Sequence, residues 1–92
     1  MIKSFRHKGL KLFFETGSNK GINAEHAPKL ARILDRLDAS KSPADMDLPG
    51  YKLHKLTGQE RDYWAVWISS NWRITFKFAA EDAMDVDYLD YH

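Results

Sequence analysis

The sequence predicts an α+β domain in which two N-terminal helices pack on one face of a mainly antiparallel sheet. Apolar residues recur with helical spacing before residue 40 and alternate, as in strands, after residue 50. The connections between the expected strands are short, which favours antiparallel neighbours. The chain has 92 residues, which suits a single domain spanning 1–92 and leaves no room for a second one.

The first predicted helix lies between Ser4 and Gly17. Ser4 is of a residue type that caps helix N-termini, and Gly17 is expected to end the helix in a left-handed conformation. Between them, three apolar residues recur at i, i+3 and i+4, namely Leu10, Phe13 and Phe14. This spacing predicts a helix with one buried face.

The second predicted helix carries an apolar stripe at i, i+3, i+4 and i+7, formed by Leu30, Ile33, Leu34 and Leu37. Two starting points are open. Asn23 can cap the helix, although Pro28 would then lie inside it and remove one backbone hydrogen bond. A first turn nearer Pro28 is equally compatible with the sequence, because proline is tolerated there. Residues 40–50 follow as a linker, punctuated by two prolines and a glycine.

Four strands are expected after this linker, over residues 51–56, 63–69, 72–78 and 84–89. Successive side chains of a strand point to opposite faces, so the position number assigns each residue to the core or to the outer face. The side chains expected to point toward the core are those of Tyr51, Leu53, Trp64, Val66, Ile68, Trp72, Ile74, Phe76, Phe78, Met84, Val86 and Tyr88.

The outer face of the sheet is predicted to combine cations with an imidazole and an indole. Its members are Lys52, His54, Trp67, Arg73 and Lys77, with Ala65, Ser69 and Thr75 among them. Cations bind phosphate, an aromatic ring stacks on a base and an imidazole transfers protons, which together suit single-stranded RNA. An ordinary solvated sheet face is also polar, so the pattern by itself leaves a purely structural surface open.

Charge is distributed unevenly along the chain. All 14 lysines and arginines lie in residues 1–77, whereas residues 78–92 hold five acidic residues and no lysine or arginine. A basic body of this kind can attract a polyanion. The absence of cysteine excludes disulfides and thiolate chemistry. No signal-peptide pattern or apolar run of membrane-spanning length is present, so a cytoplasmic protein without membrane partners is expected.

The four histidines are scattered and have no metal-ligand spacing, so no metal site is predicted. His7 and His26 are expected to be surface side chains on helices. The C-terminal residues Asp90, Tyr91 and His92 are different, because three functional groups directly follow a predicted strand. They would lie within reach of the outer face of the sheet.

Four segments resemble the HigB toxins, the host-inhibition branch of the RelE-like toxins within the ParE superfamily. They are the opening residues 1–10, the block YKLHKLTG over 51–58, the strand NWRITF over 71–76 and the terminal DYH. The resemblance implies a RelE-like microbial ribonuclease fold and a toxin that cleaves translated mRNA in the ribosomal A site. It also implies a HigA-like helix-turn-helix antitoxin as partner, with no metal or other cofactor.

The same resemblance carries functional roles to individual positions. The residues that match the catalytic positions of the family are His54, Arg73, Asp90, Tyr91 and His92, and those expected to bind RNA are Lys52, Lys55, Trp67 and Lys77. An arginine suits the phosphate because its guanidinium can form two parallel hydrogen bonds. Both His54 and His92 are suited to proton transfer, and the sequence leaves open which is the base and which the acid.

Two positions depart from the family pattern. Related toxins often have a lysine where this chain has Thr57, and a second arginine on the strand that here contains residues 67–70. Lys52, Lys55 or Lys77 can substitute for these cations. The alternative is a catalytically attenuated protein of the same fold that binds its antitoxin and takes part in operator regulation.

Overall fold

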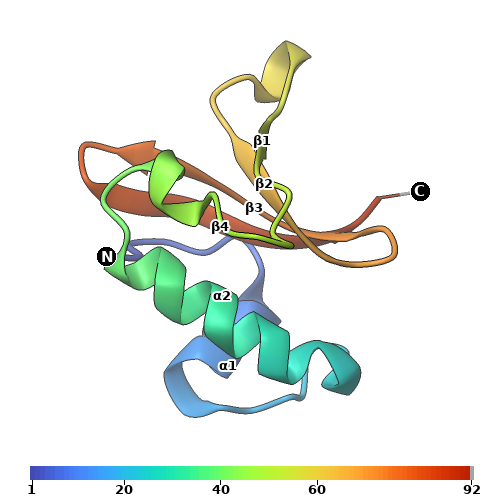
Figure 1. The fold of residues 1–92 in the computed structure, drawn as a ribbon. Coiled ribbons are helices and arrows are strands. Elements are labelled where there is room, and N and C mark those ends of the chain that lie inside the picture. The colour runs from blue at the N-terminus through green and yellow to red at the C-terminus, as the bar shows by residue number, and fades with distance from the viewer. Residues whose placement is uncertain (92) are drawn as a thin grey trace.

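The computed structural model, which describes residues 1–91, confirms the α+β class. A four-stranded antiparallel sheet has the order β1-β2-β3-β4, and two helices lie on one of its faces (Figure 1). The strands are β1 (His54–Lys55), β2 (Trp64–Ser69), β3 (Trp72–Ala79) and β4 (Asp82–Asp90), and the helices are α1 (Lys8–Thr16) and α2 (Ala27–Ala39). Three short 3-10 helices, η1 (Ala24–His26), η2 (Pro43–Met46) and η3 (Gly58–Glu60), lie in the connections.

Helix α1 ends as predicted but begins with a different cap. Gly17 has a left-handed backbone with φ of 80°, and its N–H donates to the carbonyl of Phe13. The N-cap is His7, whose Nδ1 accepts from the N–H of Leu10 at 2.9 Å. The prediction of Ser4 as the cap was wrong, because the Ser4 hydroxyl instead accepts a hydrogen bond from the backbone N–H of Asp85 at 2.8 Å.

The second helix begins near Pro28, the second of the two predicted starts, and Asn23 caps a separate 3-10 helix before it. Asn23 caps the 3-10 helix η1 through the N–H of Glu25 at 3.0 Å. Helix α2 then begins at Ala27, which places Pro28 in its first turn, where the missing N–H costs no hydrogen bond. The predicted apolar stripe is fully buried, as Leu30, Ile33, Leu34 and Leu37 are all 0% exposed.

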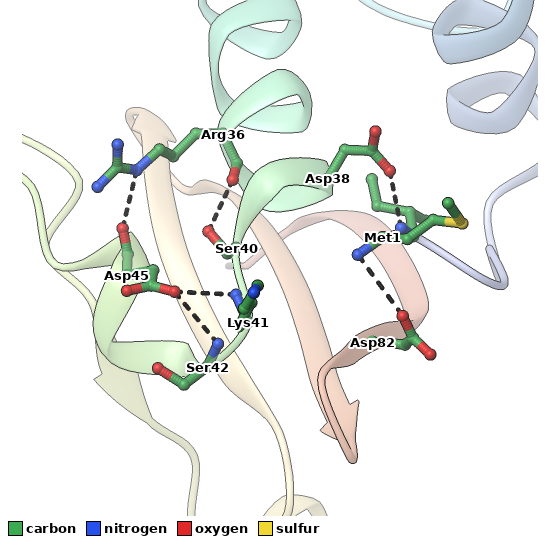
Figure 2. Close-up of polar contacts among 9 residues, drawn as sticks. Met1, Arg36, Asp38, Ser40, Lys41, Ser42, Asp45 and Asp82 are labelled. Atoms are coloured by element: carbon green, nitrogen blue, oxygen red, sulfur yellow. Dashed lines mark hydrogen bonds and ion pairs between the residues drawn. The ribbon is translucent and has the colours of Figure 1, made fainter.

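Residues 40–50 are more ordered than a linker. Figure 2 shows the Asp45 carboxylate accepting from the N–H groups of Lys41 and Ser42, at 2.9 and 3.3 Å. These donors, that of Lys41 first, lower the pKa of Asp45. Arg36 of α2 donates through Nε to the Asp45 carbonyl oxygen at 2.9 Å. Because Met46 is completely buried, this segment closes one end of the core.

The first residues of the chain lie beside β4. Ile2 and Phe5 form parallel bridges with Ala83 and Val86, so these residues extend the sheet at its β4 edge. The N–H of Ile2 also donates to the Asp38 carboxylate at 2.8 Å (Figure 2). The sequence patterns did not predict this pairing.

A bulge in β4 changes which of its residues are buried. Two residues, Asp85 and Val86, lie opposite the single β3 residue Phe76, and Asp85 has a positive φ of 54°. The bulge shifts the alternation by one position, so that Ala83 is buried and Met84 is not part of the core. The prediction of Met84 as an inward residue was therefore wrong, whereas those of Val86 and Tyr88 are confirmed.

The predicted strand over residues 51–56 shortens to two paired residues. Lys52 has a positive φ of 50°, which bends the chain just before β1. Tyr51 and Leu53 nevertheless pack against the core as predicted. On the outer face, Ala65 and Thr75 are buried because their short side chains pair at the centre of the sheet. No helix among the described residues is long and apolar enough to cross a bilayer.

Candidate functional site

Two rows of paired residues across the sheet position the predicted site. The first row runs from His54 of β1 through Ala65 and Thr75 to Asp87 of β4. The second row pairs Trp67 with Arg73, and Arg73 with Leu89. Arg73 and Thr75 are two residues apart on β3, so both rows belong to the same face and lie roughly 7 Å apart. The sheet therefore brings His54 and Arg73 to one face, opposite the helices.

Arg73 is held at the turn between β2 and β3. Its Nη1 donates to the carbonyl oxygens of Ser70 and Trp72, both at 3.0 Å. The side chain is half-buried and forms no ion pair with a carboxylate among the described residues. The guanidinium keeps free donors, so it can bind an anion.

Tyr91 is bonded to the same turn that holds Arg73. Its N–H donates to the carbonyl of Asn71 at 2.8 Å, which ties the chain to the β2–β3 turn just beyond the end of β4. Burial raises the pKa of the Tyr91 hydroxyl, and the charge of Glu60 raises it further, while Arg73 acts in the opposite direction. The hydroxyl is therefore protonated at neutral pH and can donate a hydrogen bond.

The geometry of His54 defines its tautomer. Its Nδ1 lies 3.1 Å from the carbonyl oxygen of Lys52, and a carbonyl can only accept. In the neutral ring Nδ1 therefore carries the hydrogen, which leaves a lone pair on Nε2. The side chain is exposed at the edge of the sheet. An exposed imidazole with a free Nε2 lone pair can accept a proton from a bound molecule.

The remaining predicted positions lie around this centre. Asp90 is exposed at the end of β4 and pairs with Trp72 across the sheet. His92 lies outside the described residues. Lys55 is exposed on β1, with Nζ 5.8 Å from the centroid of the Trp64 ring.

Trp67 and Lys77 contact other side chains of the protein. Trp67 donates through Nε1 to the Ser70 carbonyl at 3.0 Å, and two ammonium groups lie against its ring, those of Lys29 and Lys52. Lys77 forms an ion pair with Asp85 at 3.6 Å. It stands four positions beyond Arg73 on β3, roughly 13 Å along the strand.

Sequence comparison decides the family. The family profile described as "RelE-like toxin of type II toxin-antitoxin system HigB" matches residues 3–92. The chain belongs to this family. It is also similar to the Endoribonuclease HigB of Proteus vulgaris, with 42% identity over 92 residues that cover 100% of both chains. The family membership confirms the resemblance to the HigB toxins that the sequence motifs indicated, and the α+β fold agrees with it.

Beside the predicted site, this HigB-family toxin has a buried histidine, His26, that was predicted from the sequence to lie on the surface. His26 is 7% exposed, not on the surface, with Nδ1 2.6 Å from the Tyr88 hydroxyl and Nε2 2.9 Å from the Ser69 hydroxyl. The Ser69 side chain therefore points to the helix face, because the pairing between β2 and β3 shifts after Trp67. The prediction that Ser69 shares the outward direction of Trp67 was wrong. His7, predicted on the surface, is a half-buried helix cap.

Three further residues near the site were not predicted. Glu60 and Asp87 act on the pKa of Tyr91, and Lys29 of α2 reaches the edge of the sheet. Lys29 has no sequence signal, because only the tertiary packing of α2 brings it to Trp67. Within residues 1–91, histidines and carboxylates do not gather into a group of three that could hold a metal ion.

Proposed function

We propose that this toxin is a ribosome-dependent mRNA endonuclease that cleaves translated mRNA in the A site and thereby inhibits translation. The single observation that supports it most is that the β2–β3 turn holds Arg73 and is also the point where the Tyr91 backbone is bonded, through Asn71, on a sheet whose outer face also carries His54. Membership of the HigB toxin family and the name of the Proteus vulgaris relative support RNA cleavage as the reaction.

The proposed reaction is an attack of the ribose 2′-oxygen on the adjacent phosphorus. Nε2 of His54 takes the 2′-hydroxyl proton, the new P–O bond forms, and the bond from phosphorus to the 5′-oxygen breaks. The leaving oxygen takes a proton from an acid, for which His92 is the candidate. The products are a 2′,3′-cyclic phosphate and a 5′-hydroxyl. Proton transfers of this kind are typically worth about 10²–10⁴ in rate each.

Arg73 and Tyr91 serve the phosphate in this scheme. The guanidinium stabilises the negative charge that develops on the phosphate oxygens, an effect typically worth about 10²–10³ in rate. The Tyr91 hydroxyl donates a hydrogen bond to the same group or its ring stacks on a base, and Asp90 supports the terminal residues. The side chains named here supply the base, the acid and the cation, so we propose that cleavage needs no metal or other cofactor.

The ribosome is proposed to position the RNA. Fourteen lysines and arginines against 13 acidic residues leave a formal charge of +1, which is too little for tight RNA binding by counterion release alone. We further propose a HigA-like helix-turn-helix antitoxin as partner, and the cytoplasm as the place of action.

A reconstituted translation reaction tests this function. We expect purified toxin to cut mRNA at the codon in the A site of programmed ribosomes, and to cut the same free mRNA slowly. Efficient cleavage of free mRNA would overturn ribosome dependence. No cleavage in either state, together with normal growth on induced expression, would instead support the attenuated, antitoxin-binding alternative that Thr57 and the missing second arginine suggest.

The metal requirement is tested separately. Excess toxin is incubated with a short RNA that contains the cleaved sequence, with and without EDTA. We expect the same slow rate in both. A rate that falls on chelation and recovers with added magnesium would overturn the metal-free part of the proposal.

A further inference from the structure

The indole ring of Trp67 contacts the ammonium groups of two lysines that come from separate parts of the fold. Lys52 lies two positions before the edge strand β1, and Lys29 lies in the first turn of α2. Their ammonium nitrogens lie 4.5 and 4.2 Å from the centroid of the indole ring. Lys29 also donates to the carbonyl oxygen of Ile68 at 2.9 Å. This hydrogen bond links the start of α2 to the end of β2. The positive charges of Lys29 and Lys52 are therefore both held beside Trp67.

A third cation lies beside these two. Arg32 follows Lys29 by three positions on α2, which places it on the same side of the helix, and it is exposed. Burial lowers the pKa of Lys29, and the charges of Arg32 and Lys52 lower it further. Among the described residues, none of the three cations pairs with a carboxylate. They form a cluster of uncompensated positive charge, which we term the Trp67 cation cluster.

Like charges held together repel one another, and this arrangement persists because other contacts fix it. Each ammonium group is attracted to the face of the indole ring, and the Ile68 carbonyl gives Lys29 a further partner. A bound anion would relieve the remaining repulsion. Because the indole ring and the Ile68 carbonyl already hold the ammonium groups of Lys29 and Lys52, these two side chains would lose less freedom on binding than unrestrained lysines.

The Trp67 cation cluster adjoins the candidate site. Trp67 pairs with Arg73 across β2 and β3, and both side chains donate to the carbonyl of Ser70. An anionic chain bound at Arg73 that continues past Trp67 would meet Lys52 and then α2. Because Arg73 is proposed to bind the phosphate of the cleaved RNA, this continuity favours RNA over an acidic protein segment as the occupant.

We propose that Lys29, Arg32 and Lys52 form a second phosphate-binding site for the RNA, around the sheet edge from Arg73. It binds the backbone next to the cleaved nucleotide. Trp67 is then a positioning residue that holds the two lysines, not a platform for a base. This inference rests on the proposed RNA-cleaving function and adds helix α2 to the RNA-binding surface.

RNA binding as a function of salt tests the proposal. The probe is a 2′-O-methyl RNA of the cleaved sequence, which keeps every phosphate but lacks the attacking hydroxyl. We expect the double variant Arg32→Gln/Lys52→Gln to bind it more weakly, and the slope of log affinity against log salt to fall by about 1.4, or about 0.7 for each cation removed. The control, Lys8→Gln/Lys11→Gln, makes the same charge change on exposed positions of α1 and should leave the slope nearly unchanged.

A second variant separates positioning from net charge. Trp67→Leu removes the ring without changing the charge, and it is expected to reduce the affinity and the salt slope if the ring holds the lysines in place. Thermal melting of each variant identifies unfolding, and Trp67→Phe, which has a smaller ring and the same charge, replaces Trp67→Leu if that variant does not fold.

The outcomes are distinct. Equal losses in the cluster variant and the α1 control would show only general attraction and overturn the second site. Intact RNA binding with lost antitoxin binding would assign the cluster to the protein partner and also overturn it. Failure of the proposed function would show differently, as wild-type toxin that does not cut mRNA on ribosomes.

Discussion

Trp67 and Arg73 donate hydrogen bonds to the same carbonyl oxygen, that of Ser70, each at 3.0 Å. Ser70 has a positive φ of 50° and stands in the two-residue connection between β2 and β3. One backbone group therefore fixes an indole that holds two lysines and a guanidinium that faces the candidate site. This connection couples the candidate site to the proposed Trp67 cation cluster.

Replacing Arg73 by alanine is expected to reduce mRNA cleavage by about 10²–10³, because the main electrostatic partner of the phosphate is lost. The cost in unfolding free energy should be about 1 kcal/mol, since the carbonyls it contacts at the turn can bind water instead. Single-turnover cleavage and thermal melting measure the two effects. Arg73→Lys keeps the charge without the planar fork and should give an intermediate rate. A fully active Arg73→Ala toxin would remove this residue from the mechanism.

A chain that ends at Asp90 is expected to lose toxicity while keeping most of its stability. The truncation removes one described hydrogen bond, from Tyr91 N–H to Asn71, and a tyrosine that is 39% exposed. Loss of two functional side chains together could exceed about 10⁴ in rate. Growth on induction and the melting temperature give the readouts, with Tyr91→Phe as a variant that retains the ring. A large drop in melting temperature would show that the terminus is structural.

Adding back the two family cations is expected to have opposite results. Thr57 is exposed, so Thr57→Lys should fold normally and maintain or raise cleavage. Ser69 bonds to buried His26, so Ser69→Arg would force a charge toward the helix face and leave His26 without that partner. We expect it to destabilise the fold by about 1–3 kcal/mol. Urea unfolding distinguishes the two variants, and a stable, active Ser69→Arg toxin would contradict the direction of this side chain.

Stability should fall at both ends of the pH range because of one hydrogen bond. Tyr63 donates to the Asp85 carboxylate at 2.9 Å. This hydrogen bond is the largest of the causes that lower the pKa of Asp85 below its unfolded-state value of 3.8. The stability that it gives the fold is therefore fully present above pH 3.8, and it is lost as the pH falls through the lower pKa that Asp85 has in the folded protein. Burial, and after it the same hydrogen bond, raise the pKa of the Tyr63 hydroxyl above its unfolded-state value of 10.0. The stability that this hydrogen bond contributes is therefore present below pH 10.0, and it is lost as the pH rises through the pKa that Tyr63 has in the folded protein.

Melting temperatures between pH 2 and 12 test this dependence. Tyr63→Phe is expected to remove the alkaline loss and to weaken the acidic one, at some cost in stability at neutral pH. Tyr51→Phe is the matched control, because Tyr51 is a half-buried tyrosine at the edge of the core. Equal pH profiles for Tyr63→Phe and the wild type would show that the bond contributes nothing.

Gly9→Ala is expected to destabilise the toxin although alanine favours helices. A Cβ at Gly9 would lie 2.8 Å from Cα of Gly21, whose backbone cannot move aside cheaply. Alanine in place of glycine would stabilise helix α1 by about 1 kcal/mol, but this gain is smaller than the cost of moving α1 away from the loop that contains Gly21. Chemical unfolding of Gly9→Ala beside Gly17→Ala, where a Cβ meets nothing within 4 Å but φ is +80°, separates crowding from backbone strain.

Periodicity predicted the architecture because the buried faces of α2 and β3 follow it closely. The stripe from Leu30 to Leu37 and the residues Ile74 and Phe76 are buried as expected. Alternation failed where the backbone adds or shifts a residue. The positive φ of Asp85 and the shifted pairing at Ser69 each turn side chains to the other face of the sheet. Neither aspartate nor serine at such a position is a sequence signal that predicts a bulge.

The candidate site was predictable to the extent that it lies on strands. His54 and Arg73 reach one face because their rows are two residues apart, which position numbers already indicate. Lys29 and His26 could not be found in this way, because their partners are 39 and 62 positions away along the chain. Contacts of that kind depend on how the helix packs on the sheet.

The pairing of the first residues with β4 has a consequence for the order of folding. Ser4 and Asp85 are 81 positions apart, and contacts between such distant residues form slowly because a long loop must close first. During synthesis, at roughly 5–20 residues per second, residues 1–6 must wait for several seconds until their partner strand is made. Because Tyr91 follows that strand, the sheet edge and the surroundings of Arg73 are completed in the same late step. A growing chain is therefore expected to lack the assembled candidate site until β4 has been made.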